Sequence, residues 1–429
     1  MYKNVYIRTF GCQMNVHDSE KIRGILQEEG YLLTDSPRTA DLIIFNTCNI
    51  RQKAEQKFYS ELGRTKSHKK KRPEIKILVA GCIAQHEGEN IFKKASHVDF
   101  VFGPQNIHML KGFLRNNKFF IATEDNPDIA VIDLPVERGD GLKAWVTIIY
   151  GCNNYCSYCV VPYTRGPERS RPSEYILSEV INLAYTGYKE ITLLGQNVNS
   201  YRSNTDFSGL LRKLDTIEGI ERIRFVTSHP KDLSDELIDT ISDLPKVCEH
   251  IHLPLQSGSS NILKLMNRGY TYDDYLEKIS SLRKKILNIS ITSDIIAGFP
   301  GETDKDHLLT MNALKEIQFD GIFAFKFSPR QYTRAAGMEN QVPENIKSER
   351  LKEILRIQDN ITERINKSLE GTVHEILVEG ESKTDSSKLT GRTRTNKIVN
   401  IPKRDSCIGK LINVEIILGR KHSLKGKPV

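Results

Sequence analysis

The chain has 429 residues, of which 38% are hydrophobic and 27% charged, and its formal net charge is +8. This composition is typical of a globular protein with two to four domains. No apolar run approaches the roughly 20 residues that a membrane-spanning helix needs, and the first residues already follow a strand pattern. We therefore expect no signal peptide, no transmembrane segment and a cytoplasmic location, in which cysteines stay reduced.

Residues 1–118 are expected to form a parallel α/β domain. Apolar runs typical of strands alternate with segments typical of helices, and this alternation predicts a small parallel sheet with helices on its faces. A segment rich in turn residues, 119–137, is expected to be a linker. The predicted strands of the domain are Val5–Phe10, Leu42–Phe45, Ile75–Ala80 and Val98–Phe102.

Residues 138–368 repeat a strand–helix unit six times, which predicts a partial (β/α)6 barrel. Polar or glycine-rich segments follow the strands, and active sites of such folds lie at the C-terminal strand ends. A long helix from about residue 344 is expected to close this region. The predicted strands are Ala144–Tyr150, Glu190–Leu194, Ile223–Val226, His250–Leu255, Ile291–Ile296 and Ile322–Phe327.

Residues 369–429 are expected to form a small antiparallel β-barrel. Alternating strand patterns occur at Val373–Val378, Lys397–Ile401 and Leu411–Leu418. Residues 371–429 contain 12 Lys and Arg against 6 Asp and Glu, a net charge of +6. A basic barrel of this size favours a nucleic-acid partner. The alternative is a basic surface that is merely solvated.

Three cysteines, Cys152, Cys156 and Cys159, follow the first strand of the predicted half-barrel with three and then two residues between them. Three thiolates on one short loop can hold three corners of a cubane iron–sulfur cluster. The fourth iron then stays open to a substrate or cofactor, as the open position of a catalytic zinc site does. A zinc ribbon would need a second cysteine pair nearby, and a thioredoxin-like motif would not need Cys152. The spacing therefore predicts a catalytic cluster.

Cys12, Cys48 and Cys82 each follow a predicted strand of the first domain. Because parallel strands end at the same edge of a sheet, we expect these three thiols to meet where open α/β sheets bind ligands. They predict a second cluster site with three protein ligands. Zinc and simple burial are the alternatives. Cys248 and Cys407 are expected to be core residues or free thiols.

These motifs together resemble the radical S-adenosylmethionine methylthiotransferases, and the resemblance covers essentially the whole chain. The sequences of residues 13–15 and 163–166 are most similar to those of members that act on N6-isopentenyladenosine in tRNA. The C-terminal segment resembles the TRAM-like RNA-binding barrel of these members. The segments that carry the resemblance are Phe10–Asn15, Asn46–Arg51, Ala80–Gln85, Gly151–Gly166, Leu193–Asn199 and Leu253–Ser259.

The resemblance implies a radical reaction that inserts sulfur and a methyl group at C2 of N6-isopentenyladenosine at position 37 of tRNA. A radical cofactor suits this step because side-chain acid–base chemistry cannot break an unactivated aromatic C–H bond. A [4Fe–4S] cluster on Cys152, Cys156 and Cys159 would cleave S-adenosylmethionine. A second [4Fe–4S] cluster would carry the sulfur, held by Cys12, Cys48 and Cys82. The residues implied to contact S-adenosylmethionine are Tyr158, Gln196, Asn197 and Gln256.

The expected partners are the anticodon stem-loop of tRNA, an electron donor similar to flavodoxin or ferredoxin, and a sulfur or cluster-assembly donor. We expect a monomer. Three alternatives stay open: an enzyme acting on N6-threonylcarbamoyladenosine in tRNA, one acting on an aspartate of a ribosomal protein, and a non-catalytic iron–sulfur redox sensor that binds RNA. One segment, Arg330–Ala335, lacks the glycine and proline that the resemblance implies there, so its role is not predicted.

Overall fold

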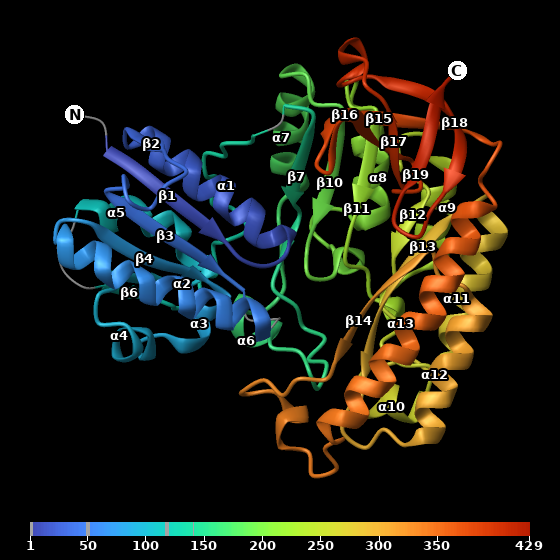
Figure 1. The fold of residues 1–429 in the computed structure, drawn as a ribbon, viewed down its shortest axis with the longest axis horizontal. Helices are drawn as coiled ribbons and strands as arrows, with labels where there is room; N and C mark the ends of the chain where they lie inside the picture. Colours follow the sequence, from blue (N-terminus) through green and yellow to red (C-terminus); the bar gives the residue numbers. More distant parts are fainter. Residues whose placement is uncertain (1–2, 49–51, 116–119, 140) are drawn as a thin grey trace.

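The computed structural model describes residues 3–48, 52–115, 120–139 and 141–429 of the chain. Within these ranges the chain forms an α/β unit, a half-barrel and a small closed barrel, in that order (Figure 1). The predicted fold class is therefore confirmed. Residues 49–51 of the motif Asn46–Arg51 lie outside the described residues. None of the described helices is both long enough and apolar enough to cross a membrane.

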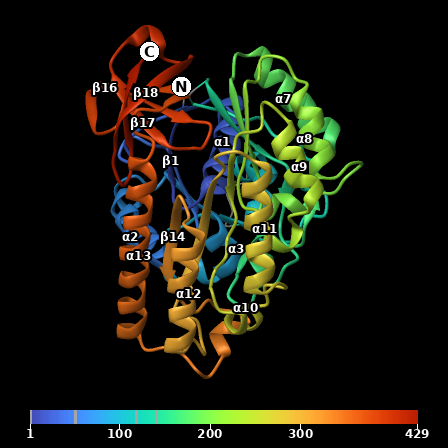
Figure 2. The ribbon, with the colours of Figure 1, turned by 90° about the vertical axis from the view of Figure 1, so that its right-hand side faces the viewer.

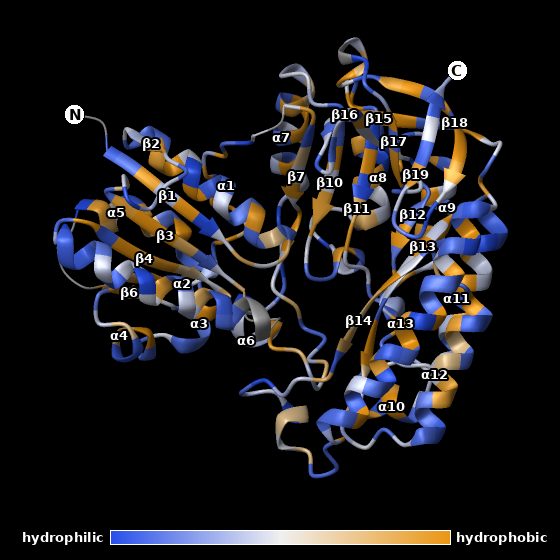
Figure 3. Ribbon diagram, viewed as in Figure 1, coloured by the Kyte–Doolittle hydropathy of each residue, from blue (hydrophilic) through white to orange (hydrophobic). Residues whose placement is uncertain are grey.

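The first unit is built on a parallel sheet with the strand order β2-β1-β3-β4-β5-β6. Its central strands are continuously apolar (Figure 3) because helices cover both faces of the sheet. On β3, Ile43 and Phe45 belong to one core, whereas Leu42 and Ile44 belong to the other. The strands are β1 (Lys3–Thr9), β2 (Tyr31–Leu33), β3 (Leu42–Thr47), β4 (Lys76–Gly81), β5 (Phe100–Phe102) and β6 (Phe120–Ala122). The helices are α1 (Gln13–Glu28), α2 (Gln52–Lys71), α3 (Cys82–Glu87), α4 (Asn90–Lys94), η1 (Pro104–Met109) and α5 (Leu110–Arg115).

Two strands of this sheet, β2 and β6, have no counterpart among the predicted strands. Each contains three residues, which is too few for a hydrophobic period to be read from the sequence. Strand β6 pairs with β5 although it lies inside the predicted linker 119–137. The first sheet therefore extends beyond the boundary expected at residue 118.

The second unit contains two three-stranded parallel sheets, β11-β10-β7 and β12-β13-β14. A bridge between Ile223 and Val247 joins them into one open half-barrel, which confirms the predicted partial (β/α)6 barrel. Helices line its outer side (Figure 2). The strands are β7 (Lys143–Thr147), β8 (Ile149–Tyr150), β9 (Arg169–Ser170), β10 (Glu190–Leu194), β11 (Arg222–Phe225), β12 (His250–His252), β13 (Ser290–Ala297) and β14 (Gly321–Lys326). The helices are α6 (Val161–Arg165), α7 (Ser173–Tyr185), η2 (Val198–Ser200), α8 (Phe207–Asp215), η3 (Pro230–Asp232), α9 (Asp235–Asp243), α10 (Ser260–Leu265), α11 (Tyr272–Lys285), α12 (Asp304–Ile317), η4 (Arg334–Gly337) and α13 (Glu344–Lys367).

Strand β13 distinguishes the two faces of the half-barrel. Ile291 and Ile295 are buried in a core that includes Leu314 and Ile317 of α12. The residues that alternate with them are only half-buried, because successive side chains of a strand point to opposite faces. The inner face of the half-barrel therefore carries the side chains of Thr292, Asp294 and Ile296.

The third unit is a closed barrel with the strand order β15-β16-β17-β19-β18. Its neighbouring strands are antiparallel except β17 and β19, which pair in parallel. Two of these strands, β16 and β19, were not predicted, because polar residues and lysines interrupt their apolar alternation. The elements are β15 (Val373–Ser382), β16 (Asp385–Thr393), β17 (Ile398–Pro402), η5 (Asp405–Cys407), β18 (Leu411–Gly419) and β19 (Leu424–Pro428).

Charged side chains attach the closed barrel to the half-barrel. Arg222 on β11 is fully buried and pairs with Glu375 at 2.7 Å. Two cations of the closed barrel likewise bond to the half-barrel. Arg394 pairs with Glu249 at 2.7 Å, and Lys397 pairs with Asp320 at 2.6 Å. Part of the positive charge that predicted nucleic-acid binding is therefore used inside the molecule.

Candidate active site at two cysteine triads

The first cysteine triad lies at the C-terminal edge of the parallel sheet, as the sequence predicts. Cys12 precedes α1, Cys48 follows β3, and Cys82 begins α3 directly after β4. The strands that precede them, β1, β3 and β4, are neighbours in the sheet. A hydrogen bond from Cys48 and the nearby Arg165 guanidinium lower the pKa of Cys12 to about 6, although burial opposes this. The three thiols therefore share one environment.

Two glycines allow the strand ends to approach each other. Gly11 has a φ of +125°, and a Cβ there would lie 2.3 Å from the Cβ of Cys48. Gly81 has a φ of +89°, and a Cβ there would lie 2.4 Å from the carbonyl oxygen of Thr47. Side chains longer than hydrogen would separate the strand ends at both positions. The glycine before each of these two cysteines is thus needed to bring the thiols together.

The amide of Asn15 connects two of the strand ends. Its Oδ1 accepts a hydrogen bond from the Cys12 thiol at 3.4 Å. Its Nδ2 donates to the carbonyl oxygen of Thr47 at 3.0 Å and to Oδ1 of Asn46 at 3.2 Å. Asn15 is fully buried, so the asparagine of the first motif positions the triad instead of contacting solvent.

The second triad lies on the loop that follows β8. The backbone N–H of Cys152 donates to the carbonyl oxygen of Gly166 at 3.2 Å, and that of Cys159 donates to the carbonyl oxygen of Cys156 at 2.9 Å. Burial and the two neighbouring thiols raise the pKa of Cys159 to about 12. Burial also raises the pKa of Cys152. Mutual repulsion of thiolates in a buried loop means that a positively charged group is needed to hold all three in the ionised form.

Arg268 supplies positive charge to this loop. Its side chain is 4% exposed, and Nη1 donates to Sγ of Cys156 at 3.3 Å and to the hydroxyl of Tyr158 at the same distance. Its Nη2 donates to the carbonyl oxygen of Pro254 at 2.9 Å. A charged donor to a cluster sulfur tunes a metal site from outside its ligand shell. No local pattern indicated this role, because Arg268 lies between α10 and α11, 112 residues from Cys156 in the chain.

The loop is also fixed by the half-barrel around it. Ser157 accepts a backbone hydrogen bond from Ala335 and donates from its hydroxyl to the carbonyl oxygen of Leu265, both at 2.7 Å. Tyr155 has a φ of +44°, and its carbonyl oxygen accepts from the amide of Asn267 at 3.1 Å. The segment Arg330–Ala335, whose role was not predicted, is thus one support of the cysteine loop.

The two triads adjoin each other through α6. Arg165, at the end of that helix, forms an ion pair with Asp18 of α1 at 2.8 Å, and both side chains are no more than 5% exposed. Burial raises the pKa of Cys82, and the Arg165 guanidinium beside it opposes that rise. A second link joins Lys21 to the hydroxyl of Tyr150 at 2.9 Å. A residue six positions after the second triad therefore lies at the first triad.

Of the four residues implied to contact S-adenosylmethionine, Tyr158 lies on the cysteine loop, whereas Gln196, Asn197 and Gln256 follow C-terminal strand ends. Tyr158 is half-buried beside Arg268, and Gln196 is half-buried after β10. Gln256 has a φ of +75°, an uncommon conformation for a residue with a side chain. The amide of Asn197 is already used: it donates to Asp232 at 2.6 Å and accepts from the backbone N–H of the residue before η3 at 3.1 Å. Cofactor contact by these residues stays a prediction, and Asn197 has the least capacity for it.

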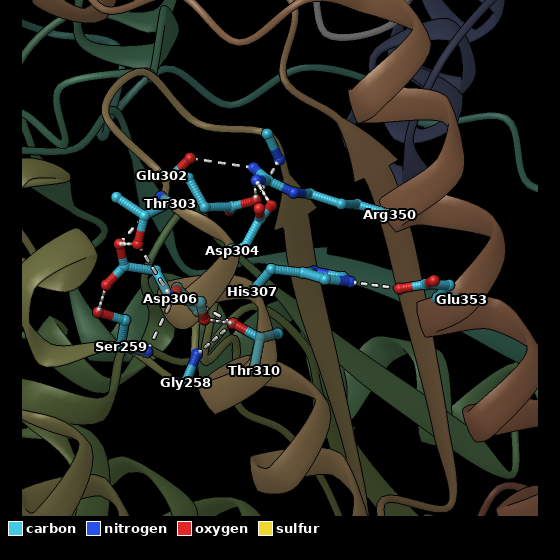
Figure 4. Close-up of polar contacts among 12 residues, drawn as sticks. Gly258, Ser259, Glu302, Thr303, Asp304, Asp306, His307, Thr310, Arg350 and Glu353 are labelled. Carbon is cyan, nitrogen blue, oxygen red and sulfur yellow. Dashed lines mark hydrogen bonds and ion pairs between the residues drawn. The ribbon is translucent and has the colours of Figure 1, made fainter.

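A polar network fixes the loop that contains Gln256 (Figure 4). Ser259 donates to Asp306 at 2.6 Å, and the N–H of Gly258 donates to Oγ1 of Thr310 at 3.0 Å. A Cβ at Gly258 would lie 2.6 Å from a carbonyl oxygen of α12, so this glycine permits the close contact. Arg350 of α13 connects Glu302 and Asp304 at 2.9 and 2.7 Å. Ser259 and the backbone N–H of Gly258 thus hold the loop against α12.

The donor set of both triads is one that iron–sulfur clusters use. Within the described parts of the chain, no three His, Cys, Asp or Glu side chains converge as a single ion would require. Cubane ligands bind different iron atoms, so the thiols of a triad need not converge on one point. Three features are consistent with such clusters: the soft thiol donors, the Arg268 guanidinium at Cys156, and Gly11, which leaves room for the Cys48 side chain.

Comparison with known proteins agrees with the three units. Residues 4–103 match an uncharacterized protein family, UPF0004, residues 146–314 match the radical SAM superfamily, and residues 367–429 match the TRAM domain. A protein of Thermodesulfovibrio yellowstonii is 58% identical over 424 residues, which cover 98% of both chains. A protein of Acetivibrio thermocellus is 49% identical, and the match covers 100% of this chain and 91% of its own. Both are named tRNA-2-methylthio-N(6)-dimethylallyladenosine synthase. The chain belongs to this family.

Membership confirms the resemblance to radical S-adenosylmethionine methylthiotransferases. It indicates that the protein uses an iron–sulfur cluster and S-adenosylmethionine, and the TRAM domain indicates an RNA partner. Among solved structures, the radical S-adenosylmethionine methyltransferase TsrM of Kitasatospora setae superimposes with a TM-score of 0.59 at 14% identity, covering 78% of this chain and 75% of its own. At that identity the likeness supports the fold alone.

Proposed function

We infer that the protein is a tRNA methylthiotransferase that replaces the C2 hydrogen of N6-isopentenyladenosine at position 37 by a methylthio group. Two [4Fe–4S] clusters serve this reaction, one on Cys152, Cys156 and Cys159 and an auxiliary one on Cys12, Cys48 and Cys82. The observation that carries this proposal is the position of Arg165. Arg165 lies at the end of α6, the helix that follows the second triad, and it pairs with Asp18 beside the first triad. A sulfur source and a radical source therefore adjoin in one protein.

The chain's own residues hold the reactive groups in place. When bound, the clusters and S-adenosylmethionine would supply the sulfur, the methyl group and the one-electron chemistry that an aromatic C–H bond requires. Arg268 donates to the sulfur of Cys156, which would be a cluster ligand. The hydrogen bond from Cys48 and the Arg165 guanidinium lower the pKa of Cys12, which favours the thiolate form that a cluster ligand requires. The pairs Arg165–Asp18 and Lys21–Tyr150 fix the first unit against the half-barrel, which sets the distance over which sulfur must reach the base.

The substrate RNA is the anticodon stem-loop, because an adenine in a loop leaves its stack at low cost. The TRAM barrel holds the RNA backbone, and this contact is salt-dependent. An electron donor similar to flavodoxin or ferredoxin reduces the catalytic cluster. A sulfur or cluster-assembly donor rebuilds the auxiliary cluster after each turnover. The protein works as a monomer.

The deciding experiment counts clusters and products in parallel. Wild-type protein reconstituted with iron and sulfide is expected to contain two clusters by chemical analysis and electron paramagnetic resonance, and to convert N6-isopentenyladenosine in an anticodon stem-loop to its 2-methylthio form. Alanine at Cys12, Cys48 and Cys82 should leave one cluster and S-adenosylmethionine cleavage but abolish sulfur insertion. Wild-type protein that binds RNA and never forms 5′-deoxyadenosine with reductant would refute the assignment and support a redox sensor.

A further inference from the structure

Strand β14 presents two aromatic side chains to solvent. Phe323 is 55% exposed and Phe325 is 37% exposed. The residues that alternate with them, Ile322 and Ala324, pack against the core of the half-barrel, so the two phenylalanines lie on the opposite, inner face. Strand β14 is the edge strand of its sheet. Adjacent exposed apolar side chains on one face mark a binding surface more often than isolated ones do.

The register of the sheet shows which side chains share this face. Phe323 pairs with Asp294, and Phe325 pairs with Ile296. Partners in a parallel ladder point to the same side, and both β13 residues are half-buried. The imidazole of His252 contacts the ring of Phe323, with centroids 6.0 Å apart, and its Nε2 lies 3.5 Å from the Asp294 carboxylate. The face is therefore mainly apolar, and its polar groups are the Asp294 carboxylate, the His252 imidazole and the Thr292 hydroxyl.

This face is continuous with the loop of the second cysteine triad. Ile296 packs against a core cluster that includes Phe299 and Phe327, and Tyr158, which lies between two of the cysteines, packs against the same cluster. Strand β14 then leads into the segment that pairs Arg330 with Glu55 of the first unit at 3.3 Å (Figure 1). The C-terminal end of the exposed aromatic face therefore lies near both the predicted radical source and the contact with the first unit.

We propose that Phe323, Phe325 and Asp294 form the specificity wall for the N6 substituent of the substrate adenosine. The two aromatic rings pack against the dimethylallyl group, which is branched and apolar. The Asp294 carboxylate repels a substituent that carries its own carboxylate, such as threonylcarbamoyl. The inference deepens the proposed function and rests on it: the same half-barrel accepts one modified adenosine and rejects the substrate of a sister activity.

Three stem-loop RNAs that differ only at the target base test this wall. The base is adenosine, N6-isopentenyladenosine or N6-threonylcarbamoyladenosine, and binding to the full-length, cluster-loaded protein is measured by fluorescence anisotropy without S-adenosylmethionine. We expect wild-type protein to prefer the isopentenyl RNA over the adenosine RNA by roughly 10-fold or more, the range typical of an apolar group in an apolar pocket. Phe323→Arg or Phe325→Arg should reduce this preference to within about twofold.

Further variants separate the wall from folding defects. Phe323→Leu keeps apolar surface and should keep most of the preference. Asp294→Asn removes the negative charge and should strengthen binding of the threonylcarbamoyl RNA relative to the adenosine RNA. Leu287→Arg places the same new charge on a side chain that is 83% exposed at the far end of β13, and it should change neither ratio. Thermal unfolding of each variant is measured alongside.

Turnover with S-adenosylmethionine distinguishes two kinds of failure. If wild-type protein forms the methylthio product and both Phe→Arg variants keep the full preference for isopentenyl RNA, the specificity wall is refuted and the proposed function stands. If wild-type protein forms neither the methylthio product nor 5′-deoxyadenosine, the proposed function fails, and the wall fails with it. Loss of the preference in the Phe→Arg variants, with 5′-deoxyadenosine still formed, supports the wall.

Discussion

Replacing Arg165 by methionine is expected to loosen the contact between the two cysteine triads. The guanidinium pairs with Asp18 at 2.8 Å across the boundary between the first unit and the half-barrel. Methionine keeps much of the packing volume but removes the charge. Asp18 would then be a buried carboxylate whose desolvation is no longer offset by a cation.

The magnitude follows from the burial of the pair. Both side chains are at most 5% exposed, and removing one partner of such a pair costs about 3–5 kcal/mol. An exposed pair, Lys111–Glu28, whose side chains are 43% and 51% exposed, is worth at most about 1 kcal/mol. Lys111→Met is therefore the matched control for Arg165→Met.

The assay is a double-mutant cycle of Arg165→Met and Asp18→Asn, with unfolding of the first unit followed by urea-dependent proteolysis. Each single variant should lose about 3–5 kcal/mol, and the double variant should lose clearly less than their sum, because neutral partners leave no buried charge. Iron content after reconstitution should fall in Arg165→Met, since the first triad loses its nearby cation. If each single variant lost no more unfolding free energy than Lys111→Met, or if the two losses were strictly additive, the pair would not join the triads.

Gly11→Ala should displace the Cys48 side chain, because the new Cβ would lie 2.3 Å from it at a φ of +125°. Reconstituted protein should then contain one cluster instead of two, whereas Gly63→Ala in α2, which meets no atom within 4 Å, should keep both. Burial lowers the pKa of His229 to about 2, so below pH 6.5 only the unfolded state takes up this proton, and stability should fall by about 1.4 kcal/mol per pH unit from this group. In thermal unfolding, His229→Gln should lose less stability than wild type between pH 7 and pH 5. A pH dependence equal to that of wild type would show that His229 is not its source. Arg222→Met should release the closed barrel, seen as earlier proteolytic cleavage near residue 370 and weaker RNA binding, because the carbonyl oxygens of Arg392 and Glu375 lose their donor at the contact between the two units.

Much of the architecture could be predicted from periodicity. Long apolar runs gave the strands β3, β4, β10 and β13, and the position of a cysteine after each strand of a parallel sheet gave the first triad. Short or polar strands escaped the prediction: β2 and β6 have three residues each, and β16 begins with polar residues. Pairing with a neighbour, which no local pattern encodes, is what makes these segments strands.

The predicted roles of polar residues at strand ends were less informative. Asn197 suggested a cofactor contact, but its amide is used by Asp232 and the neighbouring backbone. The basic charge of the closed barrel suggested RNA contact, yet part of this charge is used inside the protein, because Arg394 pairs with Glu249 of the half-barrel. A polar side chain has the same sequence signature whether it binds a ligand or a neighbouring loop, so only its three-dimensional partners distinguish the two.

The sequence by itself determined both cysteine triads, because spacing on one loop and position after parallel strands are local properties. Only the tertiary structure decided that the triads adjoin. Arg165 and Asp18 are 147 residues apart in the chain, and Arg268 is 112 residues from the Cys156 thiol that it contacts. No periodicity or spacing links residues at such separations. Their contact arises from the way in which the α/β unit packs against the half-barrel, where burying a charge requires a partner of opposite sign.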